Sequence, residues 1–272
     1  MRNSKILSKI DFWIILDLVL IALALCWINY GNFDIEVQNY LFDFESKSWL
    51  VDKNEPVKKF IFYKLPKILF GVAVVGCLVG AIFGFRDSKQ ILKQVQDDNA
   101  LALRYSNSQL SPLRHPELVS GSIPKSNFLI RHRHRLLLIF FGFSFIPLIA
   151  GNIKKFTNVY CPTQLEIYGG DKPYIRIFEH YPSSFHQAKK AQCFPAGHSV
   201  TGFTLMILFF ALRRRSQRCL GLISAIILGW IMGFYQMAKG AHFFGDTLVS
   251  MLVCFLLAAL ITRIYLKFQK YD

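Results

Sequence analysis

Residues 239–246 read KGAHFFGD and lie between two long apolar runs, where hydrophobic burial alone has no use for a histidine and an acid. His242 and Asp246 are four residues apart, so a helical turn places them on one face. The imidazole can then donate one ring N–H to the carboxylate and keep its other nitrogen free as a base or nucleophile. The structural alternative is that Asp246 caps the next helix and His242 lies at an interface.

The composition is that of a membrane protein. Of the 272 residues, 53% are hydrophobic and 26 are phenylalanine, which is unusual for a soluble domain. We predict an all-α integral membrane protein with amphipathic or short helices in its outer loops. About 20 helical residues cross the ~30 Å hydrocarbon layer, and six apolar runs approach that length. These runs are residues 12–29, 66–85, 136–153, 198–212, 219–238 and 247–266. The fourth run is short and needs its flanking arginines to snorkel.

Charge predicts the orientation, because short cytoplasmic loops carry an excess of Lys and Arg. With both termini in the cytoplasm, most basic residues lie inside and most acidic residues outside. The net charge of +15 is therefore largely topological, and no motif supports nucleic-acid binding. The first apolar run has a basic start but no small-residue cleavage site, so we expect an uncleaved anchor in an inner (plasma) membrane of bacterial type.

Two segments between the spans differ in character. The outer loop 31–65 is amphipathic and aromatic, and we expect it to form short helices at the membrane surface that act as a lid or wall. The inner segment 86–135 has weak periodicity and several Ser, Pro, Asn and Gly residues, and we expect one short helix in it at about 88–103. We expect residues 1–272 to form one six-span domain with a disordered cytoplasmic insertion at about 95–127.

The second outer loop, residues 152–197, collects polar groups. Gly197 and His198 stand at the mouth of the fourth run, where free backbone N–H groups favour an anion. Cys161 and Cys193 lie in this same loop, so we predict a disulfide between them in an oxidising compartment. A zinc site is the weaker alternative, since it needs more ligands than the loop supplies.

The six-span topology brings three polar clusters to the same side of the membrane. Lys154 follows the third run, His198 begins the fourth, and the His242–Asp246 pair lies between the fifth and sixth. Phosphoryl transfer through a covalent histidine uses all of these groups. A neutral imidazole attacks phosphorus, the carboxylate fixes its tautomer, a cation holds the oxygens and a second imidazole protonates the leaving group. We expect no metal and no cofactor.

The same segments resemble the signature motifs of the type-2 phosphatidic acid phosphatase family, membrane lipid phosphatases that share their fold with vanadium haloperoxidases. The first motif is Lys, six residues, then Arg-Pro, and here Lys154 is followed by six residues and Cys161-Pro162. The second, Pro-Ser-Gly-His, is matched by residues 195–198, which read PAGH. The third ends in His, three residues and Asp, as His242 and Asp246 do.

The resemblance implies roles for individual residues. His242 is implied as the nucleophile that forms phosphohistidine, Asp246 as its orienting partner and His198 as the acid for the departing alcohol. Lys154 is implied as a phosphate clamp, with Gly197 in the backbone cradle. The alternative for Lys154 and His198 is a purely interfacial position.

The chain departs from the family pattern at two arginines, which are replaced by Cys161 and Gln236. A point charge does not easily replace the guanidinium fork. We expect Lys239, three residues after Gln236, to supply part of the missing charge. Arg176 or Lys172 of the second outer loop is the other candidate.

These observations predict metal-independent hydrolysis of a phosphate monoester or diphosphate on a membrane lipid, at the extracytoplasmic face. The HFFGD ending and the aromatic first loop are similar to bacterial lipid A phosphatases, but undecaprenyl diphosphate and glycerophospholipid phosphates fit the same residues. The alternatives are a lipid phosphotransferase with the same intermediate and an inactive scaffold or transporter. The partners expected are the lipid substrate and the bilayer, and the oligomeric state stays open.

Overall fold

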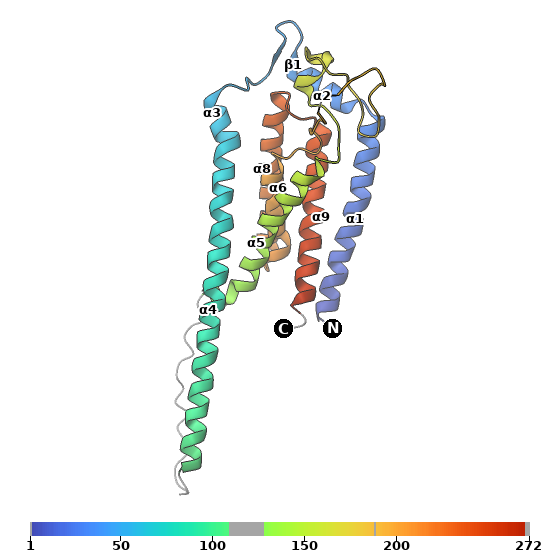
Figure 1. Cartoon of the computed structure of the whole chain (residues 1–272). Coiled ribbons are helices and arrows are strands. Elements are labelled where there is room, and N and C mark those ends of the chain that lie inside the picture. Colours follow the sequence, from blue (N-terminus) through green and yellow to red (C-terminus); the bar gives the residue numbers. More distant parts are fainter. Residues whose placement is uncertain (1, 109–127, 188, 270–272) are drawn as a thin grey trace.

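The computed structural model describes residues 2–108, 128–187 and 189–269. Five long helices stand side by side, and the chain begins and ends at the same end of this bundle (Figure 1). The long helices are α1 (Arg2–Tyr30), α4 (Leu65–Ser108), α5 (Phe128–Ile153), α8 (Arg215–Ala238) and α9 (Phe244–Phe268). In the part of the chain that is described, these five are long and apolar enough to cross a membrane.

The fourth predicted span, residues 198–212, is not confirmed as a membrane crossing. Its apolar helical part runs only from Val200 to Ala211, as α6 (Val200–Phe203), a 3₁₀ turn (Thr204–Met206) and α7 (Ile207–Ala211). Twelve residues rise about 18 Å, well short of the hydrocarbon layer. Phe203 and Ile207 have no exposed surface. The apolarity of this run is therefore that of a buried core segment.

Close backbone contact fixes α6 inside the bundle. A Cβ on Gly202 would lie 2.5 Å from the backbone nitrogen of Gly229 in α8, and a Cβ on Gly229 would meet the ring of Phe203. Small residues at such a crossing let two helices approach closely. His198 lies two residues before α6, so this contact also anchors the histidine.

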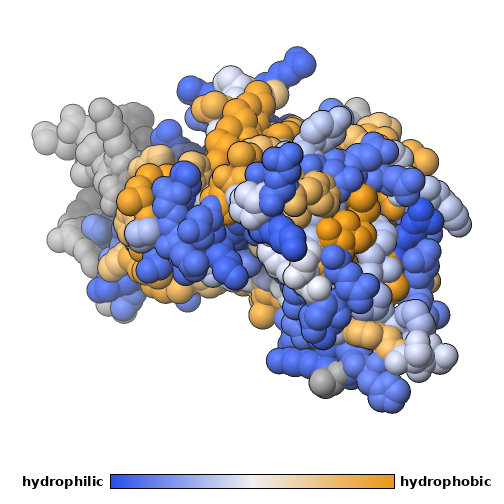
Figure 2. Space-filling view, turned by 90° about the horizontal axis from the view of Figure 1, so that it is seen from above, coloured by the Kyte–Doolittle hydropathy of each residue, from blue (hydrophilic) through white to orange (hydrophobic). Residues whose placement is uncertain are grey.

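The end of the bundle away from the termini carries a cap. The cap contains α2 (Phe33–Leu41), the strands β1 (Phe42–Asp43) and β2 (Ser48–Trp49), and 3₁₀ turns at Pro162–Gln164 and Glu166–Tyr168. The strands pair antiparallel, Phe42 with Trp49, so the all-α prediction missed a small hairpin. Phe42, Tyr168 and Phe243 form the core of the cap. Seen from above, hydrophilic side chains cover much of this end, with hydrophobic patches between them (Figure 2).

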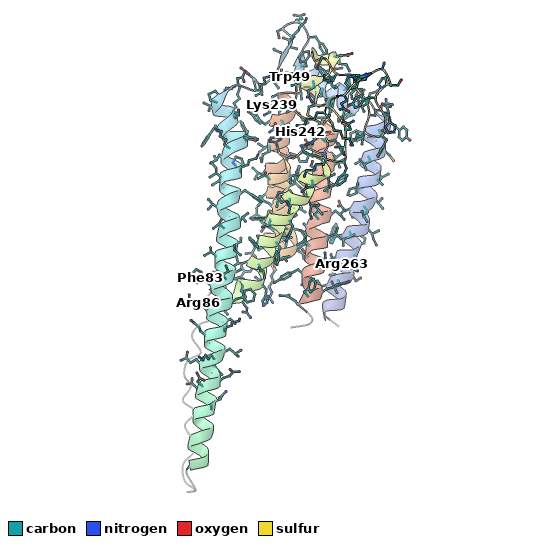
Figure 3. The ribbon with its side chains drawn as sticks, viewed as in Figure 1. Trp49, Phe83, Arg86, Lys239, His242 and Arg263 are labelled. Carbon is teal, nitrogen blue, oxygen red and sulfur yellow. A yellow bond between two sulfur atoms is a disulfide. The ribbon has the colours of Figure 1, made fainter. Side chains whose placement is uncertain are left out.

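The cap is connected to the bundle by α3 (Pro56–Lys59) and a π-helical turn (Phe60–Lys64) that leads directly into α4. At the opposite end of the molecule, Arg263 of α9 pairs with Asp11 of α1. Figure 3 shows Arg263 far from His242, which lies just under the cap.

Residues 95–108, the described part of the predicted insertion, are helical. The helix α4 runs unbroken to Ser108 and projects beyond the other helices after Arg86 (Figures 1 and 3). Between Arg86 and Ser108 the chain has no proline or glycine and contains good helix formers such as Gln, Leu, Lys and Ala. Residues 109–127 lie outside the described residues.

Candidate active site

The turn between α8 and α9 carries His242, and its shape depends on Gly240. Gly240 has a φ of +69°, and a Cβ there would lie 2.3 Å from Cε2 of Trp49. Glycine is the residue that adopts this conformation without a steric cost. The carbonyl of Gly240 also accepts the N–H of Thr163 at 2.9 Å, which ties the turn to the second outer loop.

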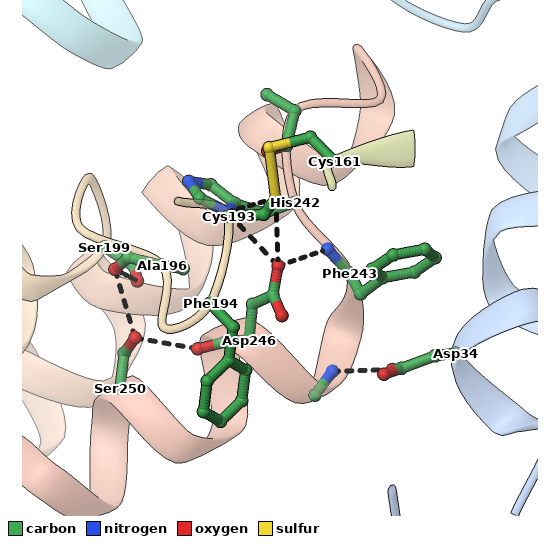
Figure 4. Close-up of polar contacts among 12 residues, drawn as sticks. Asp34, Cys161, Cys193, Phe194, Ala196, Ser199, His242, Phe243, Asp246 and Ser250 are labelled. Atoms are coloured by element: carbon green, nitrogen blue, oxygen red, sulfur yellow. Dashed lines mark hydrogen bonds and ion pairs between the residues drawn. A yellow bond between two sulfur atoms is a disulfide. The ribbon is translucent and has the colours of Figure 1, made fainter. Parts of the chain in front are cut away.

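His242 and Asp246 form the buried pair that the four-residue spacing predicts. Nδ1–H of His242 donates to Oδ2 of Asp246 at 3.2 Å, and both residues are 3% exposed. The same carboxylate oxygen accepts the N–H of Phe243 at 3.0 Å, so Asp246 also caps α9 (Figure 4). The capping and the pairing alternatives therefore both apply to Asp246. With Nδ1 occupied, Nε2 of the neutral ring keeps a lone pair.

The first outer loop braces this turn, a role that the sequence did not reveal. Gln38 of α2 donates from Nε2 to the carbonyl of His242 at 2.8 Å. One helical turn earlier, Asp34 accepts the N–H of Gly245 at 2.7 Å. Burial, with the nearby charge of Asp246, raises the pKa of Asp34 to about 7. The i, i+4 spacing of these two polar residues in an amphipathic segment was the available signal.

His198 and Lys154 approach the His242–Asp246 pair from two other parts of the chain. The ring centroids of His198 and His242 are 5.7 Å apart. Lys154, just after α5, lies over Gly197, where a Cβ would be 2.9 Å from its Cε and 3.1 Å from its Nζ. Gly197 therefore leaves room for the amine. Burial lowers the pKa of Lys154, while the charge of Asp246 opposes that shift.

Burial and nearby positive charge favour the neutral form of both histidines. Burial lowers the pKa of His242 to about 3, with Lys154 and Lys239 as further causes. Burial also lowers the pKa of His198 to about 3, and His242 and the nearby lysines add to that shift. A neutral His242 suits nucleophilic attack. A bound phosphate would offset the positive charges around His198 and raise its affinity for a proton.

The structure joins Cys161 and Cys193 in a disulfide, the pairing expected from the sequence, with 5.1 Å between the Cα atoms. Sγ of Cys193 lies 3.4 Å from Nδ1 of His242 and 3.5 Å from Oδ2 of Asp246 (Figure 4). The bond thus fills the wall behind the pair and ties the loop after Lys154 to the segment before His198. Cys161, Cys193 and His242 are close enough to ligate a metal, but sulfurs bonded to each other supply no thiolates. The expected absence of a metal stays a prediction.

Of the residues expected to replace the charge of the family arginines, Lys239 lies near the site and Arg176 is held by other partners. Nζ of Lys239 lies 5.9 Å from the ring centroid of Tyr63. The ring of Tyr63 is tilted by 41° against that of His198, with 5.0 Å between the two centroids. Arg176 instead donates to Asn32 at 3.1 Å and lies 3.9 Å from a carboxylate oxygen of Glu179. Its predicted contact with phosphate therefore has no support in the structure.

Among the described contacts, Lys172 does not reach the site, and the neutral side chain of Gln236 supplies no charge there. Lys172 pairs with Asp171 at 2.7 Å. Gln236 is 1% exposed, and neither atom of its amide has a partner within the part of the chain that is described. The residues that stand at the two family arginine positions, Cys161 and Gln236, therefore do not themselves replace the missing positive charge.

A model of the PAP2 superfamily matches residues 135–270, which contain Lys154, His198, His242 and Asp246. No curated protein and no solved structure matches the chain in the corresponding comparisons.

Proposed function

Because the chain belongs to the PAP2 superfamily, which supports phosphatase-type activity on phosphate esters, we propose that it hydrolyses a phosphate group carried by a membrane lipid. The observation that carries this proposal is the convergence of one amine and two neutral imidazoles beside a buried carboxylate. Five apolar helices make the chain a membrane protein, so a lipid is the natural substrate at a site just under the cap.

The proposed reaction has two steps. Nε2 of His242 attacks phosphorus while the bond to the leaving oxygen breaks, and His198 gives that oxygen a proton. Lys154 balances charge on the non-bridging oxygens, and Asp246 stabilises the imidazole as it loses its lone pair. A water then attacks the phosphohistidine and passes a proton to His198, which frees phosphate and restores His242.

The proposed location is the outer face of an inner membrane. The site lies at the end of the bundle opposite the two ends of the chain (Figures 1 and 3). The excess of basic residues in the predicted inner segments supports a cytoplasmic location for those ends. The disulfide beside His242 also suits an oxidising compartment. The lipid A branch of the family stays a prediction.

Phosphate release from a panel of lipid phosphates, measured with a chelator present, tests the proposal. We expect release by the parent and by His180→Ala, which changes an exposed histidine of the second outer loop, and none by His242→Ala. Release that requires added magnesium, or that survives His242→Ala, would count against the mechanism. Label that moves to an acceptor lipid with little free phosphate would assign a transferase instead.

A further inference from the structure

A second group of cations, Lys67 and Lys239, lies near His198, and Lys67 belongs to a segment outside the matched family region of residues 135–270. Nζ of Lys67 in α4 lies 4.0 Å from the ring centroid of Tyr63, and Nζ of Lys239 lies 5.9 Å from it. The rings of Tyr63, His198 and His242 follow one another, with 5.0 Å and 5.7 Å between neighbouring centroids. Lys154 thus lies beside His242, and two further lysines, Lys67 and Lys239, surround the ring of Tyr63 next to His198.

The local backbone explains how Tyr63 and Lys67 reach this position. Tyr63 lies within the π-helical turn Phe60–Lys64, and Lys67 follows one helical turn later in α4. Single π turns within a helix are rare and occur frequently at functional sites. Phe62 of the same turn stacks on Tyr235 of α8, with 5.4 Å between the ring centroids, so the turn packs against the helix that Lys239 directly follows.

An apolar groove begins at the same turn. It has a volume of about 420 Å³ and runs between α4, α5, α6 and α8. Phe62, Leu65 and Pro66 line it on the side of Lys67, and Leu69 continues the lining one turn along α4. Nearly all of its lining side chains are apolar, and Lys67 itself is exposed. Cations at one end and hydrocarbon along the rest suit an anionic lipid whose chain enters sideways.

We propose that the substrate is a lipid diphosphate, which deepens and rests on the proposed function. The terminal phosphoryl lies between His242 and Lys154. The inner phosphate, which becomes the leaving group, lies at Lys67 and Lys239. The lipid chain then occupies the groove along α4.

The order of groups matches the order of bonds. The Nε2–phosphorus bond forms at His242 as the bond from the terminal phosphorus to the bridging oxygen breaks, and His198 protonates that oxygen. The leaving lipid monophosphate keeps its charge, which Lys67 and Lys239 balance. Hydrolysis of the phosphohistidine then releases inorganic phosphate. The chain has Cys161 and Gln236 where the family pattern has arginines, and in this proposal Lys67 and Lys239 supply two cations on the leaving-group side instead.

The test compares farnesyl monophosphate with farnesyl diphosphate on the full chain in lipid nanodiscs. We expect Lys67→Gln to lower kcat/KM for the diphosphate about tenfold or more, because a charge-assisted contact to the leaving phosphate is lost. We expect a change of less than about threefold for the monophosphate. Lys64→Gln, which removes an exposed lysine of the π-helical turn, is the matched control and should change neither rate. The melting temperature of each variant checks that it is folded.

The outcomes separate this inference from the function on which it rests. Farnesyl monophosphate and inorganic phosphate as products, with selective loss in Lys67→Gln, support it. Equal loss on both substrates, or release of inorganic pyrophosphate, would overturn it while leaving a histidine-dependent phosphatase in place. Hydrolysis of neither substrate would overturn both.

Discussion

The Cys161–Cys193 disulfide joins two residues that are 32 positions apart in the sequence. It closes most of the second outer loop, which links Lys154 to His198. Replacing both cysteines with alanine releases that loop in the unfolded state. The loop length corresponds to about 4 kcal/mol by chain entropy, and native disulfides commonly contribute about 2–4 kcal/mol. For a chain of this size we expect the melting temperature to fall by roughly 10 °C.

The assay is thermal unfolding in detergent without reductant, followed by size-exclusion chromatography of the soluble fraction. Cys219→Ala is the control, because Cys219 is a free and exposed cysteine. Reducing the parent with dithiothreitol should reproduce the melting temperature of the double variant, and should leave the double variant unchanged. We also expect kcat to fall, since Sγ of Cys193 packs against His242. A double variant that melts within about 2 °C of the parent would refute the reasoning.

Three further predictions concern the groups around the catalytic turn. Gln38→Ala leaves the buried carbonyl of His242 without its donor, so we expect a loss of about 1–3 kcal/mol in unfolding free energy and a lower kcat; an unchanged melting temperature would contradict this. Asp34 has a pKa raised from 3.8 to about 7, so its contribution to stability is full below pH 4 and is lost as the pH rises to about 7. Asp34→Asn should remove that component from melting curves measured across this range, and a parallel pH profile in parent and variant would argue against it. Gly197→Ala pushes a methyl group against Lys154, so we expect kcat/KM to fall about tenfold with little change in melting temperature; normal kinetics would show that Lys154 does not hold the phosphate.

The sequence predicted the parts of the fold that depend on simple length and spacing. Apolar runs of about 20 residues located the five long helices, because a hydrocarbon layer requires that length. The same criterion does not confirm the span predicted at residues 198–212, because the apolar helical part there runs only from Val200 to Ala211, and a run of that length can equally be a core helix. The helix expected at about residues 88–103 is part of α4, which continues to Ser108, because the segment after Arg86 has no proline or glycine to end it.

Part of the candidate site could also be predicted from spacing along the sequence. The spacing of His242 and Asp246 specifies their contact within one turn, and alternation of the spans placed Lys154 and His198 at the same end. The contributions of Gln38, Tyr63 and Lys67 were not accessible, because they depend on how the first outer loop docks on the bundle. Arg176 illustrates the converse: a cation in the correct loop, yet held by Asn32 and Glu179.

Trapping the covalent intermediate tests the central claim most directly. A lipid phosphate labelled in its terminal phosphoryl group is mixed with the protein and quenched in base within a fraction of its turnover time, and the labelled peptide is identified by mass spectrometry. We predict base-stable, acid-labile phosphate on His242, formed in the presence of chelator and absent from His242→Ala. Turnover by a protein that never carries phosphate on His242 would contradict the account.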